Sequence, residues 1–297
     1  MTIEKALDRA IMLRETAANP NLKACYWVEN RPYENYLSNE SWAEFKADME
    51  HNHHRAYIAY GLGGGKEMEE RTVGKYTYPP KMASFGSSSR MIYNLMKSNP
   101  NFFYEKKLPT TIGGTANLDG FYETNEKSLF VEAKCREPYS HKNGEIADKY
   151  MNLYSFLTKS ERNNITCKMT PSQKGKMVVQ FFAGEKLLER FDIKQMICHL
   201  LGIATDRLQG ICCKGTDFIY LLYNPSALHI ENERHRKEIL RIYNQECREC
   251  ESIDFKGLFY DLLYFLAETE NIGKTSYVEQ IARSFSFRMC DQHTMTI

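Results

Sequence analysis

The sequence lacks the features that mark a membrane or secreted protein. No apolar run approaches the roughly 20 residues of a membrane-spanning helix, and the N-terminus has no apolar region of the signal-peptide kind. The formal net charge is +1, which excludes a uniformly basic binding protein but leaves a local basic face open. We therefore expect a cytoplasmic protein with no membrane association.

Disulfide-framework and metal-finger patterns are also missing. The nine cysteines form an odd set without framework spacing, which favours free thiols in a reducing compartment. Cys247 and Cys250 have a zinc-like spacing, but they lie in a helical pattern and lack a second C-x-x-C pair. Free thiols are the better interpretation of both.

The chain is long enough for one large core with additions. It has 297 residues, of which 42% are hydrophobic. We divide it into an N-terminal helical extension with a glycine-rich loop (1–85), a core (86–230) with a polar insertion near 136–176, and a C-terminal helical segment (231–297). The core is predicted to be α/β, with a mixed central β-sheet flanked by helices.

The most informative segment spans residues 113–139, which predict two strands joined by a tight polar turn. If Glu123 faces Ser128 across that turn, Asp119 lies directly opposite Glu132. Directly opposed residues point to the same face of a sheet, with Cβ atoms about 4.5–5.5 Å apart. Two carboxylates would then meet, and because opposed like charges destabilise a sheet, a bound cation is the natural compensation.

The second strand has one charged and one apolar face. Because side chains alternate along a strand, Glu132 and Lys134 share one face. The other face carries an apolar stripe suited to packing under a helix: Leu129, Val131, Ala133 and Cys135.

A solvated hairpin with a cross-strand Lys–carboxylate contact is the alternative. The Glu-x-Lys pattern alone is not specific, since Glu44-Phe45-Lys46 matches it too. The context favours a metal site, because Leu-Asp-Gly ends one strand and Phe-Val precedes the Glu on the next.

This arrangement resembles the PD-(D/E)XK nuclease superfamily, the restriction-endonuclease-like fold. The whole chain resembles uncharacterised bacterial proteins assigned to it as restriction endonucleases, although Leu118 replaces the leading Pro of the signature. The resemblance implies a Mg²⁺-dependent deoxyribonuclease, with Mn²⁺ as a substitute and with Asp119 and Glu132 as metal ligands. Lys134 would orient or activate the attacking water, and the backbone carbonyl of Ala133 would add a ligand.

A helix predicted over 191–202 adds a further candidate. It is capped by Asp192, ended by Gly202, and carries Gln195 and His199 four residues apart on one face. This is similar to the Gln-x-x-x-Tyr motif of related nucleases, with His in place of Tyr, and implies that Gln195 positions water and phosphate. A capping box from Asp192 to Gln195 explains the pattern as well.

Glu105 is a third acidic candidate. It lies in a predicted strand over 102–110, in a Glu-x-x-Leu-Pro pattern that precedes the motif Asp in some relatives, which implies a further metal ligand. A surface Glu beside Lys106 and Lys107 is the alternative.

DNA contacts are expected at two places. Ser88 and Arg90 begin a helix predicted to run through Lys97, and a helix N-terminus favours anions, although simple capping is the alternative. Lys142 and Lys174 belong to the polar insertion, where phosphate contacts compete with a solvated charged face.

Together these features predict a metal-dependent DNA endonuclease, and a homodimer would match double-strand cutting. Within the enzyme class the alternative is a structure-selective or exonucleolytic DNA nuclease. From other classes, a non-catalytic nucleic-acid-binding protein on a nuclease scaffold and an interaction module with a charged surface hairpin stay open.

Overall fold

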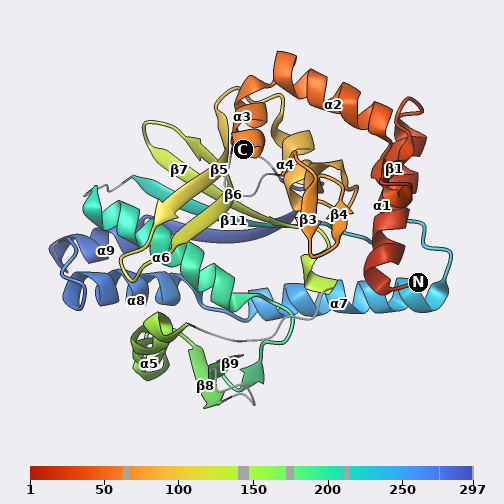
Figure 1. The fold of residues 1–297 in the computed structure, drawn as a ribbon. Coiled ribbons are helices and arrows are strands. Elements are labelled where there is room, and N and C mark those ends of the chain that lie inside the picture. Colours follow the sequence, from red (N-terminus) through yellow and green to blue (C-terminus); the bar gives the residue numbers. More distant parts are fainter. Residues whose placement is uncertain (63–66, 140–146, 172–176, 211–213, 274, 296–297) are drawn as a thin grey trace.

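The computed structural model describes residues 1–62, 67–139, 147–171, 177–210, 214–273 and 275–295. Its centre is a mixed five-stranded sheet in the order β12-β11-β7-β6-β5 (Figure 1). The strands are β5 (Phe102–Pro109), β6 (Thr115–Glu123), β7 (Lys127–Lys134), β11 (Gly215–Leu222) and β12 (Phe285–Asp291). The first three form an antiparallel meander, and β11 runs parallel to both β7 and β12. The predicted mixed sheet is confirmed.

Strand alternation divides the interior into two apolar clusters, one on each face of the sheet. On one face α4 (Ser88–Met96) packs against β6 and β7, and on the other α6 (Ile193–Gln209) packs against β5 and β6. The predicted stripe of β7 lies in the α4-side cluster, as expected, while Phe130 lies in the α6-side cluster. The charged residues of β7 therefore face α6.

Gly202 has a different role from the predicted one. The helix does not end there but continues to Gln209, so the predicted stop is wrong. A Cβ on Gly202 would lie 2.6 Å from the Cβ of Ala116 and 3.1 Å from that of Leu108. Glycine is needed because α6 approaches β5 and β6 closely at this point, a tertiary requirement that the local pattern does not show.

The N-terminal region is not wholly helical. It contains α1 (Ile3–Ala18), α2 (Asn39–Asn52), α3 (His54–Leu62) and a short 3₁₀ turn, η1 (Lys81–Ala83). Two small antiparallel hairpins accompany them: β1 (Ala24–Val28) with β2 (Arg31–Leu37), and β3 (Arg71–Val73) with β4 (Tyr76–Tyr78). These strands have only three to seven residues, so their sequences carry little periodic signal. Most of the glycine-rich loop lies outside the described residues.

The polar insertion and the strands after it share the α6-side apolar cluster of the core. The described residues of the insertion form η2 (Glu137–Tyr139), η3 (Asp148–Tyr150), α5 (Met151–Lys159) and β8 (Ile165–Pro171), and β9 (Met177–Ala183) and β10 (Lys186–Leu187) follow it. The three strands make a separate sheet in the order β10-β9-β8. Figure 1 shows α5, β8 and β9 beneath α6 and α8.

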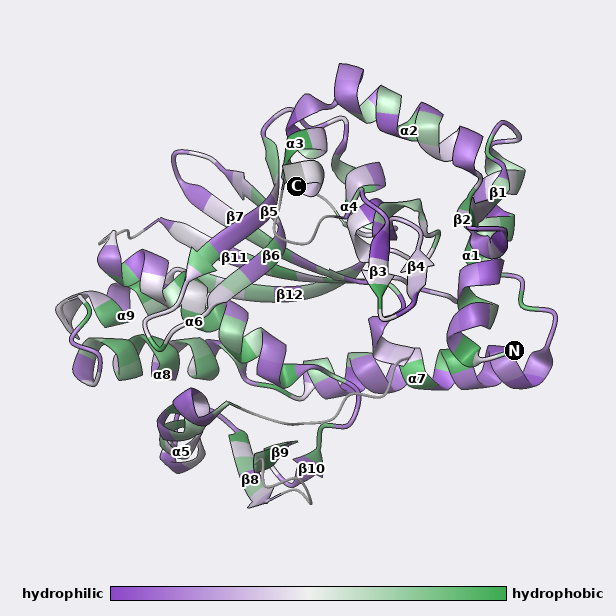
Figure 2. Cartoon of the chain, in the orientation of Figure 1, coloured by the Kyte–Doolittle hydropathy of each residue, from purple (hydrophilic) through white to green (hydrophobic). Residues whose placement is uncertain are grey.

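The C-terminal region completes the core. It contains α7 (Glu233–Glu251), α8 (Phe255–Glu268) and α9 (Thr275–Arg283), and α8 packs against α6, α9 and α5. Figure 2 shows α8 as largely hydrophobic, whereas α7 is mostly polar. The predicted C-terminal helical segment also contains a strand, β12, which forms an edge of the central sheet. In the part of the chain that the structure describes, no helix is long and apolar enough to cross a membrane.

Gly202→Val tests the close approach of α6 to the sheet. We expect it to lower the free energy of unfolding by about 1–3 kcal/mol, since the new side chain overlaps Ala116. Urea denaturation measures the change. Gly61→Ala is the matched control in another helix, because the nearest contact of its Cβ outside that helix backbone would be the Met68 sulfur at 3.8 Å. An equal loss in both variants would contradict this explanation.

Candidate active site

A polar cleft of about 380 Å³ brings together the acidic candidates of the sequence. Its lining includes Glu105, Asp119, Glu132, Lys134 and Gln195. They come from β5, β6, β7 and the first turn of α6. Three adjacent strands and one helix therefore supply one site, although the residues are far apart in the chain.

Asp119 holds the hairpin together at the point where backbone pairing stops. The β6–β7 ladder keeps the predicted register from the turn to Gly120 and Val131, and it ends there. The expected direct pairing of Asp119 with Glu132 does not form. Instead, Asp119 Oδ2 accepts a hydrogen bond of 2.7 Å from the backbone N–H of Ala133, so its side chain replaces the missing ladder acceptor.

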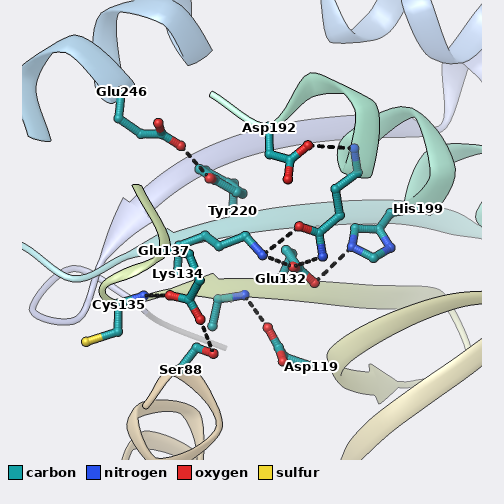
Figure 3. Close-up of polar contacts among 12 residues, drawn as sticks. Ser88, Asp119, Glu132, Lys134, Cys135, Glu137, Asp192, His199, Tyr220 and Glu246 are labelled. Atoms are coloured by element: carbon teal, nitrogen blue, oxygen red, sulfur yellow. Dashed lines mark hydrogen bonds and ion pairs between the residues drawn. The ribbon is translucent and has the colours of Figure 1, made fainter. Parts of the chain in front are cut away.

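Glu132 is the centre of a buried polar network (Figure 3). Its Oε1 accepts hydrogen bonds from Lys134 Nζ at 2.5 Å and from Gln195 Nε2 at 2.9 Å. Its Oε2 lies 3.1 Å from His199 Nε2. Lys134 Nζ also donates to Gln195 Oε1 at 2.9 Å. Gln195 therefore belongs to the site, and His199, noted in the sequence but not selected, contacts it as well.

The start of α6 is fixed so that it presents these two side chains to β7. Asp192 is the N-cap, as predicted, and its Oδ1 accepts the backbone N–H of Gln195 at 3.0 Å. The Gln195 side chain turns to Glu132 and Lys134. His199, one turn later on the same helix face, is 3% exposed.

Burial and pairing set the charge states of Glu132 and Lys134. Burial favours the neutral carboxyl, but the adjacent Lys134 and His199 outweigh it and lower the pKa of Glu132 to about 2. Burial likewise opposes the charged ammonium, and Glu132, Glu137 and Asp119 raise the pKa of Lys134 above its usual value. The pair is therefore ionised at neutral pH.

The other two acidic candidates, Asp119 and Glu105, have raised pKa values. The pKa of Asp119 is raised well above its usual value by burial and then by the charge of Glu132, more than Lys134 lowers it. The pKa of Glu105 is raised by burial and by Glu67. Glu105 also has a φ of +57°, a left-handed conformation that costs a non-glycine residue energy and is found at functional sites.

The structure does not bring Arg90 to the cleft, so the expected phosphate contact of its side chain is wrong. The side chain is 3% exposed and donates to Glu15 Oε2 at 2.7 Å. Its guanidinium also lies 4.8 Å from the ring centroid of Phe85. The helical pattern predicted α4 but not the partly buried ion pair with Glu15 on α1.

Ser88 does line the cleft, but its hydroxyl donates to Glu137 Oε1 at 3.0 Å. A carboxylate therefore occupies the position near the start of α4 where a phosphate was expected. Lys142 and Lys174 lie outside the described residues.

Four charged residues of the cleft lining were not selected from the sequence: Glu67, Lys81, Arg136 and Glu137. Arg136 and Glu137 follow Lys134 by two and three positions, a proximity that could have singled them out. Glu67 and Lys81 come from the polar stretch before α4, and only tertiary structure brings them to β5 and β6.

The cleft fits a hard cation with few protein ligands. Among the described residues, no three His, Cys, Asp or Glu side chains form a metal-binding group. Asp119 and Glu132 supply two carboxylates, and Mg²⁺ usually takes only one or two. The raised pKa of Asp119 marks an unfavourable charge that a cation would compensate. Ligation by the Ala133 carbonyl stays a prediction.

Comparisons with family models, curated proteins and solved structures gave no match. The inference of function therefore depends on the cleft itself.

Asp119→Asn should stabilise the metal-free protein. When the pKa of a carboxyl group is higher in the folded than in the unfolded protein, the free energy of unfolding falls as pH rises from the usual pKa of 3.8 to the folded-state pKa. The amide of Asn does not ionise, so it removes this loss, and its oxygen can still accept the hydrogen bond from the backbone N–H of Ala133. Above that pKa we expect a gain on the order of 1 kcal/mol, measured by urea denaturation between pH 4 and 9. Glu123→Gln is the control, because the pKa of Glu123 is lowered and its removal should reduce stability at neutral pH. A pH-independent effect of Asp119→Asn would contradict the charge argument.

Lys134→Met should be strongly destabilising, because it leaves Glu132 ionised and buried without its cation. The expected loss is about 3–5 kcal/mol. The double variant Glu132→Gln/Lys134→Met removes both charges and should recover most of the loss. Urea denaturation of the single and double variants measures the coupling, and equal losses would show that the ion pair is not the controlling interaction.

Proposed function

We propose that this protein is a Mg²⁺-dependent deoxyribonuclease that hydrolyses DNA phosphodiester bonds as an endonuclease. The observation that carries the proposal is the meeting of Asp119, Glu132, Lys134 and Gln195 in one cleft. These are the residues that the resemblance to restriction-endonuclease-like nucleases implies, and a mixed sheet flanked by helices supports that resemblance.

The residues suit this chemistry in complementary ways. Asp119 and Glu132 would hold the metal ion, which polarises a phosphoryl oxygen and lowers the pKa of bound water. The ammonium of Lys134 stabilises negative charge that develops on the phosphate. Gln195 contacts both Glu132 and Lys134, so it fixes their orientation before the substrate arrives.

A non-catalytic nucleic-acid-binding protein is the second candidate. Both oxygens of Glu132 already contact protein groups, which is the observation that favours it. The raised pKa of Asp119 argues for the nuclease, since a binding protein gains nothing from an unfavourable buried carboxylate. Structure-selective or exonucleolytic cleavage and a homodimer are variants of the proposal that the cut pattern and the measured mass would decide.

Cleavage of supercoiled plasmid and of end-labelled single- and double-stranded oligonucleotides tests the proposal. With Mg²⁺ or Mn²⁺ we expect nicking or linearisation that chelator abolishes. Asp119→Asn should lower the rate at least 100-fold, because it removes a metal ligand. It should also abolish stabilisation by Mn²⁺ in thermal unfolding.

Glu123→Gln lies on the same hairpin outside the cleft, where Glu123 contacts Ser128 and Lys214, and should keep full activity. Salt-sensitive DNA binding without cleavage, unchanged by Asp119→Asn, would reject the nuclease proposal in favour of a non-catalytic nucleic-acid-binding protein. Neither cleavage nor binding would reject both.

A further inference from the structure

Two ion pairs in the cleft share an unusual arrangement. In each, a partly exposed cation that lines the cleft is paired with a buried carboxylate. Lys81 is paired with Glu67, and Arg136 is paired with Asp8. Both lie outside the network around Glu132.

Lys81 is on η1, and its Nζ lies 2.5 Å from Glu67 Oε1. The Lys81 side chain is 42% exposed, whereas that of Glu67 is 7% exposed. Glu105 lies near both, since their charges act on its pKa in opposite directions. This pair therefore belongs to the β5 side of the cleft.

Arg136 follows β7, and its Nη1 lies 3.1 Å from Asp8 Oδ2 on α1. The exposed fractions are 37% for Arg136 and 6% for Asp8. A Cβ on Gly86 would lie 1.9 Å from Asp8 Oδ1, so only glycine allows this carboxylate to approach. The Asp8 carboxyl has a raised pKa, chiefly because it is buried.

Stability alone gives a weak reason for such pairs. A half-exposed cation gains little from an ion pair, and burying the carboxylate paired with it costs desolvation energy. Two apolar residues would fill the same positions at lower cost. What the arrangement achieves is orientation, because the carboxylate is fixed by burial and holds the cation at the cleft surface.

We propose that Lys81 and Arg136 bind backbone phosphates on either side of the phosphate that is cleaved. The substrate is then a nucleic-acid strand held at three or more phosphates, with Lys134 at the central one, and not a free nucleotide. Glu67 and Asp8 are positioning residues. This inference rests on the proposed nuclease function and adds the contacts that select a polymer.

The salt dependence of DNA binding tests the two cations directly. Each phosphate contact contributes about 0.7 (single strand) to 0.9 (duplex) to the slope of log K against log salt concentration. In the Asp119→Asn background without divalent metal, Lys81→Gln and Arg136→Gln should each lower the slope by about that amount, and together by about twice as much. Lys81→Arg and Arg136→Lys should keep it. Fluorescence anisotropy with labelled oligonucleotides measures the affinities.

Matched controls come from ion pairs outside the cleft. Lys127→Gln, beside Asp217, and Arg241→Gln, beside Glu238, should leave the slope unchanged.

Removing one partner leaves a buried carboxylate uncompensated and can unfold the protein. The double variants Glu67→Gln/Lys81→Gln and Asp8→Asn/Arg136→Gln avoid this and should show the same reduced slopes. Folded double variants with the parental slope would overturn the inference and leave the nuclease proposal intact. A parent protein that cleaves DNA but binds it with no salt dependence would also overturn the inference and leave the nuclease proposal intact. A parent protein that neither cleaves nor binds DNA would overturn both the inference and the nuclease proposal.

Discussion

The buried ion pair of Glu132 and Lys134 is the interaction on which the rest of the site depends. Both residues lie on β7, an interior strand between β6 and β11, and both are nearly inaccessible to solvent. An unpaired charge there would cost several kcal/mol, so every neighbouring polar atom matters. α6 supplies the remaining partners through Gln195 and His199, and its close packing on the sheet at Gly202 makes that contact geometrically feasible.

The same network separates the two central carboxyl groups electrostatically. Glu132 is paired with the ammonium of Lys134 and is a stable anion. Asp119 accepts a backbone N–H and is repelled by the charge of Glu132. Two carboxyl groups whose pKa values move apart are a common basis for a division of roles in active sites. Here the division points to Glu132 as a fixed anion and to Asp119 as the group whose ionisation would be coupled to cation binding.

Local patterns predicted the parts of the site that depend on local physics. The β6–β7 turn fixed the register, alternation assigned the faces of β7, and Asp192 marked the start of α6. Tertiary packing could not be predicted in this way. The pattern at Gly202 predicts a helix stop, but α6 continues because this glycine allows close packing on the sheet. Arg90 is predicted to contact phosphate, but its side chain pairs with Glu15 instead. β12 was missed because a lone strand after three helices has no neighbour in sequence that identifies its partner.

The N-terminal region is part of the cleft as well as of the fold. Asp8 on α1 orients Arg136, and Glu67 orients Lys81, while the apolar cluster on the α4 side of the sheet combines residues of α1, α4, β7 and α7. The predicted boundary at residue 85 therefore separates segments of sequence but not independent physical units. The cleft takes residues from segments that are distant in the chain. The positions of Lys81 and Arg136 therefore depend on the same packing of the N-terminal region against the sheet that determines the fold.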